Sequence, residues 1–273
     1  MANHAIIAAA IKKLYALPAT VLESRTIEDG WALPSHPYVL CNRQITKNTM
    51  PNTSLDTFDS VLLSNSHYRA YPAMLPYVGA DYDSPFHPRL LILGESFYFP
   101  EESTIHKVPD EWYASNQSHL TDDEVSYIHC RGLVECNWDA AGHKMYREIN
   151  ACLRELNYPT PDRPISHACF TNTFLRPASI SGQSFMHCCT NRDIYLSLEV
   201  LSSVLSTLSP HQVIFASKYG WDSVGVSLAK QFPNMIFDFV SHPADPFHWN
   251  VQAYPHGRNK FMSLLKRWAG QKT

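Results

Sequence analysis

Beyond residue 86 the sequence predicts an α/β fold with three layers (αβα), in which helices cover both faces of a central four-stranded parallel sheet. Two observations support this prediction. Short apolar runs of strand length alternate with longer segments in which apolar residues recur every three or four positions. A strand, a helix and a second strand in succession form a right-handed crossover, and a series of such units builds a parallel sheet. Residues 86–273 are therefore expected to form one α/β domain.

Four segments are predicted to form the strands. The first is Arg89–Leu93, in which four consecutive apolar residues follow the arginine and Gly94 ends the run. An uninterrupted apolar run of this length is expected to be buried on both faces of the sheet. The others are Ile165–Phe170, Gln212–Ala216 and Met235–Val240. Ligands bind such sheets at the carboxyl ends of the strands, so the residues after each strand are the informative ones.

Four helices are predicted to alternate with these strands, because apolar residues form one stripe along each segment. Asn137 can cap the first helix, and Pro210 ends the second. The four helical segments are 138–156, 194–208, 221–231 and 261–268.

Residues 1–85 are predicted to be an N-terminal extension that packs on this domain. A short amphipathic helix is expected at Ala5–Leu17, and it ends at Pro18. The stretch that follows is rich in proline and polar residues, and its periodicity is weak.

Composition places the chain among globular proteins. Of its 273 residues, 45% are hydrophobic and 17% are charged, which excludes a disordered chain. The net charge of −3 excludes a broadly basic coat for nucleic acid but not a local basic groove. The cysteines form no CxxC pair, no secretory signal is recognised, and no apolar run approaches the ~20 residues of a membrane span. We therefore expect a reduced cytoplasmic protein without membrane association, cofactor or metal.

Polar and aromatic side chains follow all four predicted strands. Because the carboxyl ends of parallel strands meet at one edge of a sheet, carboxylate, amide, guanidinium, imidazole and aromatic groups are expected to converge there. The four segments are Gly94–Phe99, Thr171–Pro177, Ser217–Trp221 and Ser241–Asn250.

Three of these segments resemble motifs of the uracil-DNA glycosylase superfamily. Gly94-Glu95-Ser96-Phe97-Tyr98 is similar to the first motif, Thr171-Asn172 with Arg176-Pro177 to a middle motif, and Ser241-His242-Pro243 to the last. The resemblance covers about residues 86–269. It implies a uracil-DNA glycosylase-like fold and a partner, DNA with a damaged or modified base. The reaction implied is hydrolysis of the N-glycosidic bond of a flipped uracil or related base.

The resemblance also implies roles for single residues. His242 would donate a hydrogen bond to a base carbonyl as the base departs with negative charge. Asn172 would bind the edge of a pyrimidine, since its amide offers a donor and an acceptor. Glu95 would position water or the sugar, or would instead be a structural carboxylate that accepts backbone N–H groups. Gly94, Phe97 and Tyr98 belong to the base pocket, unless the two rings pack in the core.

Ser96 is a departure from the family pattern. It stands where one version of the first motif has a water-activating Asp, and a neutral hydroxyl is a poor general base. Water activation must therefore come from elsewhere or be weak. Only Cys41 precedes the first motif, so the iron–sulfur cluster of one branch of the superfamily is not expected.

Four further residues are predicted to contact DNA. Arg176 and Lys218 are the cations expected to meet phosphates. Phe247 and Trp249 are candidate wedges for the duplex, with core packing as the alternative.

Other functions remain open from the sequence. A serine esterase would use Ser96, His248 and Asp245 as a triad, although small esterases have Asp before the serine and no G-x-S-x-G elbow is present. A protein of the same fold that binds DNA or a nucleotide without catalysis would explain the absence of Asp at position 96. A metal site at the adjacent Cys188 and Cys189 is disfavoured, because adjacent ligands hold one tetrahedral ion poorly.

Overall fold

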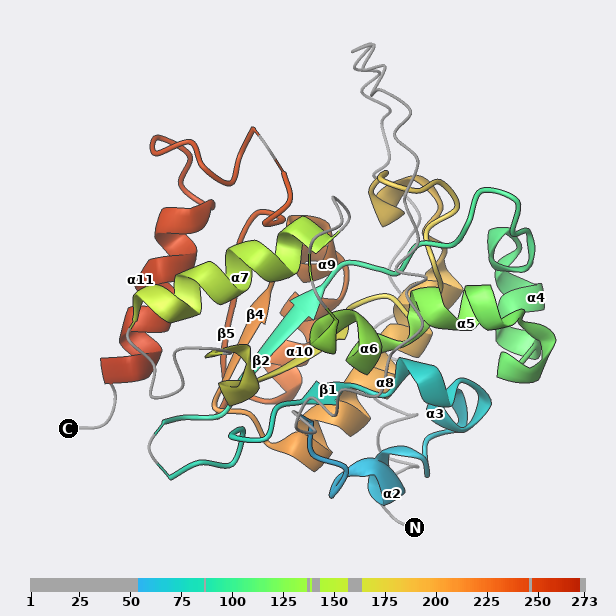
Figure 1. The fold of residues 1–273 in the computed structure, drawn as a ribbon, viewed down its shortest axis with the longest axis horizontal. Coiled ribbons are helices and arrows are strands. Elements are labelled where there is room, and N and C mark those ends of the chain that lie inside the picture. The colour runs from blue at the N-terminus through green and yellow to red at the C-terminus, as the bar shows by residue number, and fades with distance from the viewer. Residues whose placement is uncertain are drawn as a thin grey trace. The chain divides into compact units, whose positions relative to one another are not determined.

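The computed structural model describes residues 54–85, 87–136, 138, 143–156, 164–245 and 247–270. These residues belong to one compact unit, and they form an α/β fold with helices on both sides of a sheet (Figure 1). The helix predicted at Ala5–Leu17 and the predicted cap Asn137 lie outside the described residues.

The sheet has five strands in the order β1-β3-β2-β4-β5. Strands β2 (Leu90–Gly94), β3 (Ala168–Asn172), β4 (Gln212–Phe215) and β5 (Ile236–Phe239) pair in parallel, as predicted. The prediction of a four-stranded, wholly parallel sheet is nevertheless wrong, because β1 (Tyr77–Val78) pairs antiparallel with β3. Two residues are too few to show a strand period, so only pairing with the edge of β3 reveals this strand.

The helices before β3 are mostly short. The segment between β2 and β3 contains several helices where the sequence indicates only one, because helices of six or seven residues show little periodicity. Before β1 lie α2 (Asp59–Leu62), α3 (Ser66–Ala70) and η1 (Pro72–Met74). Between β2 and β3 lie η2 (Ile105–Lys107), α4 (Pro109–Ala114), η3 (Gln117–His119), α5 (Asp122–Ile128), α6 (Cys130–Glu135), α7 (Lys144–Glu155) and η5 (Pro164–His167).

After β3 the elements follow the predicted alternation more closely. The residues predicted to form the helix 221–231 form a π-helical turn followed by α-helix. The elements are η6 (Phe185–His187), α8 (Asn191–Leu208), α9 (Lys218–Gly220), η7 (Trp221–Gly225), α10 (Val226–Gln231) and α11 (Arg258–Gly270).

The order of the strands explains the layers. The chain moves from β2 to β3 in one direction along the sheet, then crosses back to β4 and on to β5. Right-handed crossovers in opposite directions place α7 on one face and α8 and α10 on the other. Figure 1 shows α7 and α11 together in front of the sheet, and these two helices contact each other.

The central strands lie fully inside the protein. Every residue of β2, β3 and β4 is buried, as expected for strands covered on both faces. Residues 54–85, assigned to the N-terminal extension from the sequence, supply β1 and several side chains of the same core, among them Tyr68, Tyr71 and Tyr82. No helix in the described ranges has the length and apolar character needed to cross a bilayer.

Three buried histidines are expected to make the free energy of unfolding sensitive to acid. Burial lowers the pKa of His67 to about 3 and the pKa values of His106 and His167 to about 4. An unfolded histidine titrates near ~6.5, so the unfolded chain binds more protons than the folded chain below that pH. Stability should therefore fall between pH ~6.5 and ~4, with up to about 1.4 kcal/mol per pH unit from each histidine.

Urea unfolding at a series of pH values measures this dependence. The variant His106→Gln should have a shallower slope than the wild-type chain, because it removes one of the three titrating groups. A stability that stays constant from pH 6.5 to pH 5 would contradict the prediction.

Candidate functional site

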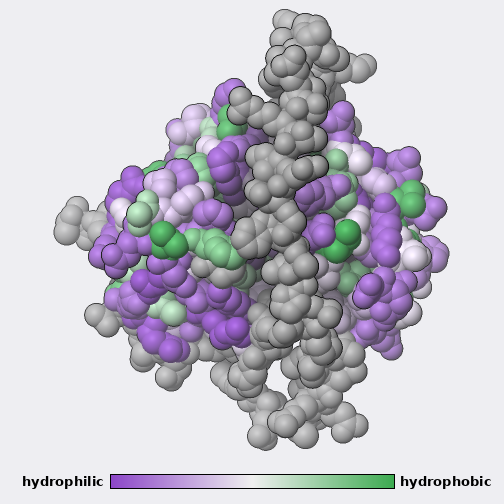
Figure 2. All heavy atoms as spheres, turned by 90° about the horizontal axis from the view of Figure 1, so that it is seen from above, coloured by the Kyte–Doolittle hydropathy of each residue, from purple (hydrophilic) through white to green (hydrophobic). Residues whose placement is uncertain are grey.

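The carboxyl ends of the parallel strands lie level at one edge of the sheet. Backbone N–H groups just after the strands donate to carbonyls at the ends of neighbouring strands. Thr173 donates to the carbonyl of Gly94 at 2.9 Å, and Val240 donates to the carbonyl of Phe215 at 2.8 Å. The strand order reverses between β2 and β4, since β3 lies on the other side of β2. Crevices at such a reversal are where ligands bind in open α/β sheets. The edge points upward in Figure 1, so Figure 2 views it from above.

Glu95, directly after β2, is held by three hydrogen-bond donors. Its Oε1 accepts from the hydroxyl of Ser184 at 2.8 Å and from the backbone N–H of Phe185 at 2.6 Å, and its Oε2 accepts from the hydroxyl of Ser217. These donors come from the segments after β3 and β4. The carboxylate therefore joins three strand ends and has a fixed orientation.

Gly94 and Asn172 occupy paired positions at the ends of β2 and β3. A Cβ at position 94 would lie 2.1 Å from Oδ1 of Asn172, so only glycine leaves room for this amide. Asn172 is buried at the end of β3, with 4% of its surface exposed.

His242 lies in the loop after β5. Its Nδ1 accepts a hydrogen bond from the backbone N–H of Ala244 at 3.2 Å. Burial lowers the pKa of His242, and the nearby carboxylates of Glu95 and Asp245 oppose this shift only in part. A neutral imidazole whose Nδ1 accepts must carry its proton on Nε2. His242 is thus a neutral donor in the electrostatic range of Glu95.

Ser96, Phe97 and Tyr98 differ in their surroundings. The hydroxyl of Ser96 is buried and has no hydrogen-bond partner within the described residues. Phe97 is part of the core, in agreement with the alternative to its predicted role in a pocket. The half-buried Tyr98 donates its hydroxyl to the carbonyl of Gln183 at 3.2 Å.

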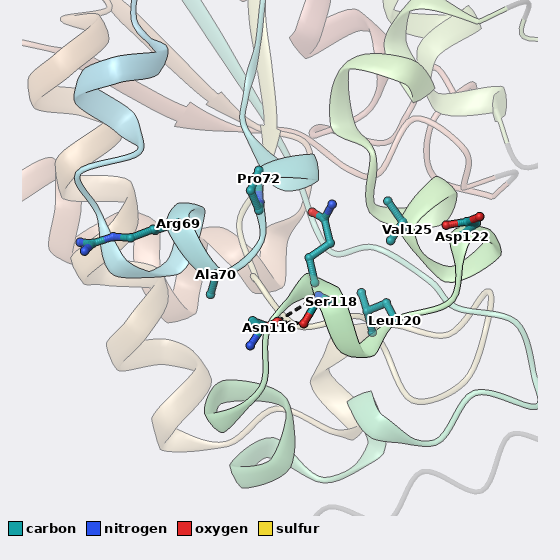
Figure 3. Close-up of a pocket in the computed structure, with 9 residues that line it drawn as sticks. Arg69, Ala70, Pro72, Asn116, Ser118, Leu120, Asp122 and Val125 are labelled. Atoms are coloured by element: carbon teal, nitrogen blue, oxygen red, sulfur yellow. Dashed lines mark hydrogen bonds between the residues drawn. The ribbon is translucent and has the colours of Figure 1, made fainter.

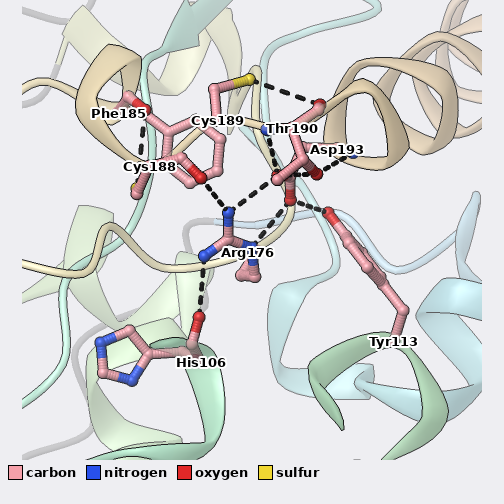
Figure 4. A network of polar contacts seen from close by, with 8 residues as sticks. All are labelled: His106, Tyr113, Arg176, Phe185, Cys188, Cys189, Thr190 and Asp193. Atoms are coloured by element: carbon pink, nitrogen blue, oxygen red, sulfur yellow. Dashed lines mark hydrogen bonds and ion pairs between the residues drawn. The ribbon is translucent and has the colours of Figure 1, made fainter. Parts of the chain in front are cut away.

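The prediction that Arg176 contacts DNA phosphates is wrong. The side chains of Arg176 and Asp193 are both 0% exposed and form a two-point ion pair, with N–O distances of 2.8 and 2.7 Å. The guanidinium also donates to the carbonyls of His106 at 2.8 Å and Cys188 at 2.6 Å (Figure 4). Burial would raise the pKa of Asp193, but hydrogen bonds from Arg176 and Thr190 outweigh it and hold that pKa below its usual value.

Of the other predicted DNA contacts, one is buried and two are exposed. Trp249 is 1% exposed, and its indole N–H donates to Glu148 at 3.0 Å, so it cannot enter a duplex. Lys218 is exposed and pairs with Asp222. Phe247 is 59% exposed.

The residues of the esterase hypothesis are not all brought together. Asp245 accepts from Nδ1 of His248 at 2.7 Å, so the predicted acid–histidine pair is formed. The hydroxyl of Ser96 makes no hydrogen bond to His248 or to any other described residue. The described chain contains no group of three or more His, Cys, Asp or Glu side chains that could hold a metal ion.

An open groove lies on another part of the protein. Its lining includes Arg69, Asn116, Ser118 and Asp122, from the segments around α3, η3 and α5 (Figure 3). None of its lining residues follows a parallel strand. The groove and the convergent polar residues are therefore separate features.

Three members of the site could not be assigned from the sequence. Ser217 follows a predicted strand, and this position was its only signal. The Ser184–Phe185 pair that binds Glu95 carries no sequence signal, since these residues are 89 and 90 positions from Glu95. Their role depends on the path of the loop between β3 and α8.

The variant Asp193→Asn is expected to lower the free energy of unfolding by about 3 kcal/mol or more, because it leaves the buried Arg176 guanidinium without a counter-charge. Urea unfolding measures the loss. The control is Arg192→Ala, which breaks an exposed pair with Asp110 and should cost less than about 1 kcal/mol. Equal losses in the two variants would refute the central role of the buried pair.

The variant Gly94→Ala should be destabilised by about 1–3 kcal/mol, because the added methyl group meets the Asn172 amide. Adding Asn172→Ala to this variant removes the nearest clashing atom and should recover part of the loss. A double-mutant cycle by urea unfolding measures this coupling, and strict additivity would contradict the predicted contact.

Neither the models of protein families nor the curated proteins contain a match to this chain. The proposed function therefore rests on the geometry of the site and on its sequence motifs.

Proposed function

We propose that this protein is a DNA glycosylase that hydrolyses the N-glycosidic bond of a flipped uracil or related modified base, on a uracil-DNA glycosylase-like fold. The observation that carries the proposal is that His242 and Glu95 follow separate parallel strands at one edge of the sheet, within electrostatic range of each other. One is a neutral hydrogen-bond donor, and the other is a carboxylate. Cleavage of this bond needs both, because the departing base gains negative charge while the sugar gains positive charge.

His242 is suited to act on the base. Its Nδ1 is occupied by the N–H of Ala244, so its remaining proton is on Nε2. A neutral N–H donor that is fixed before the reaction stabilises a developing anion without reorganising. As the C1′–N bond breaks, its electron pair goes to the base, where a carbonyl oxygen accepts the hydrogen bond from His242.

Asn172 is suited to recognise the base before it is cleaved. Asn172 is buried at the end of β3, in the position paired with Gly94. A pyrimidine edge with adjacent N–H and C=O groups would satisfy both ends of the amide. Discrimination is expected to be strong, since a base without these groups would leave the amide unpaired.

Glu95 is better suited to stabilise charge than to move a proton. Three donors orient both of its oxygens, and a carboxylate in this setting faces the cationic sugar at little cost. The buried, unpartnered hydroxyl of Ser96 next to it is a candidate site for the attacking water. Water adds to C1′ late in such a reaction, when the sugar is already cationic, and the proton that it loses neutralises the departed base anion, so a strong general base is not essential.

Binding to the DNA backbone is expected to be modest. Arg176 is not available to phosphates, and Lys218 is the remaining predicted cation. With a net charge of −3 for the chain, few phosphates can be neutralised, so affinity should come mainly from the flipped base and its neighbours.

A catalytic assay with defined oligonucleotides tests the proposal. Wild-type protein should produce abasic sites, detected by alkaline strand cleavage, in at least one member of a panel containing uracil, hypoxanthine and modified pyrimidines. His242→Ala should lower the single-turnover rate by about 10²–10³-fold, the usual effect of losing a donor to a developing anion. The control His119→Ala changes an exposed histidine of η3 and should leave the rate unchanged.

The other outcomes favour the alternatives. DNA binding without any product would favour a non-catalytic DNA-binding protein. Hydrolysis of p-nitrophenyl acetate that is lost in Ser96→Ala would favour the esterase. Product formation that survives His242→Ala would refute the role given to this histidine.

A further inference from the structure

The loop after β5 that carries His242 is attached to α7 at two points. The ammonium group of Lys144 donates a hydrogen bond to the carbonyl of Ala244 at 3.4 Å. The indole N–H of Trp249 donates to the carboxylate of Glu148 at 3.0 Å. Lys144 and Glu148 are four residues apart in α7, so both lie on one face of the helix. A helix about 100 positions earlier in the sequence therefore fixes the path of this loop.

Lys144 stands at a position that the helix itself disfavours for a lysine. It is the first residue of α7, where a positive charge meets the positive end of the helix macrodipole. An acidic or neutral residue would suit the isolated helix better. The contact with the Ala244 carbonyl, which lies outside the helix, gives the lysine a role that local structure does not.

Ala244 connects Lys144 to the imidazole of His242. Its carbonyl accepts from Lys144, and its backbone N–H donates to Nδ1 of His242 at 3.2 Å. Nδ1 accepts this bond only while it carries no proton, because a protonated Nδ1 would place two N–H groups against each other. An imidazolium would therefore lose its contact with Ala244. The position and the charge of the His242 ring thus depend on each other.

Three charged side chains among the described residues act on this imidazole. Burial is the main cause of the lowered pKa of His242. The carboxylates of Glu95, after β2, and Asp245, in the same loop, act in the opposite direction, and the Lys144 ammonium lowers the pKa further. Since both carboxylates favour the imidazolium, the positive charge of Lys144 offsets part of their effect.

We propose that Lys144 is a positioning residue for His242: it fastens the loop through the Ala244 carbonyl and keeps the imidazole in the neutral form that donates from Nε2. This inference rests on the proposed function, because His242 is the residue assigned there to the departing base. Lys144 acts through the loop and the imidazole, and it needs no contact with a substrate.

An NMR titration of ¹⁵N-labelled histidine side chains tests the proposal without any substrate. Nitrogen chemical shifts report the charge and the tautomer of each ring, and the His242 signals are identified by their absence in His242→Gln. In the wild-type protein the neutral ring should carry its proton on Nε2. Lys144→Met removes the charge at a similar side-chain length, and the midpoint of the His242 titration should rise by about 0.5 pH unit or more.

Two matched variants separate the role of Lys144 from general effects. Lys144→Arg keeps a positive charge and N–H donors, so it should retain the wild-type midpoint. Lys230→Gln removes the same charge from an exposed position in the last turn of α10, and it should leave the midpoint unchanged. Because Lys144 is only half-buried, all of these variants should fold, as circular dichroism will show.

The pH dependence of catalysis provides a second measurement. Loss of the neutral ring should define the acidic limb of the pH–rate profile for base release. In Lys144→Met this limb should move to higher pH by the same amount as the His242 titration, and in Lys144→Arg it should stay in place.

The remaining outcomes separate this inference from the proposed function. Equal midpoints in the wild type and Lys144→Met, the same rise in Lys230→Gln, or a proton on Nδ1 of the neutral wild-type ring would each overturn the role of Lys144, whatever the protein does to DNA. A rise in Lys144→Met that is absent in Lys144→Arg, in a protein that releases no base from any substrate, would support the role of Lys144 and overturn hydrolysis.

Discussion

The buried ion pair of Arg176 and Asp193 is the interaction on which the candidate site depends. Arg176 lies in the segment just after β3, and Asp193 lies in the first turn of α8. Their pairing ties the intervening loop to the helix, and the further bond to the carbonyl of Cys188 fixes the end of the loop that follows Phe185. Since Phe185 donates to Glu95, the orientation of that carboxylate follows from a charge pair that makes no contact with it.

Burying this pair is costly, and the structure shows how the cost is offset. Asp193 also accepts from the hydroxyls of Tyr113 at 2.8 Å and Thr190 at 2.7 Å, and Arg176 also donates to two backbone carbonyls. A buried charge is tolerated when its hydrogen-bonding capacity is satisfied. The same residues cap α8, because Thr190 and Asp193 form its capping box. The same contacts thus fix the start of α8, the path of the loop before it and the geometry of the candidate site.

The topology of the sheet provides the second constraint. The reversal of strand order between β2 and β4 opens the edge where Glu95, Asn172 and His242 lie on separate strand ends. Close approach of the Asn172 amide to β2 requires the missing side chain of Gly94. Each of these polar groups belongs to a different segment of the chain, and the parallel sheet brings the segments to one edge. The open groove near α3 offers room but lacks this convergence of chemical groups.

Local sequence patterns were enough to predict the parallel strands, the larger helices and the convergence of the residues that follow the strands. Apolar periodicity is local, and a parallel sheet brings its carboxyl ends together. The resemblance to glycosylase motifs then singled out Asn172, Glu95 and His242 within those segments. Which cations and aromatic rings reach solvent could not be predicted in this way. Arg176 and Trp249 are hidden by partners 17 and 101 positions away, β1 exists only through pairing with β3, and the donors to Glu95 come from distant loops. Burial and hydrogen bonding between remote segments depend on packing, which no local pattern records.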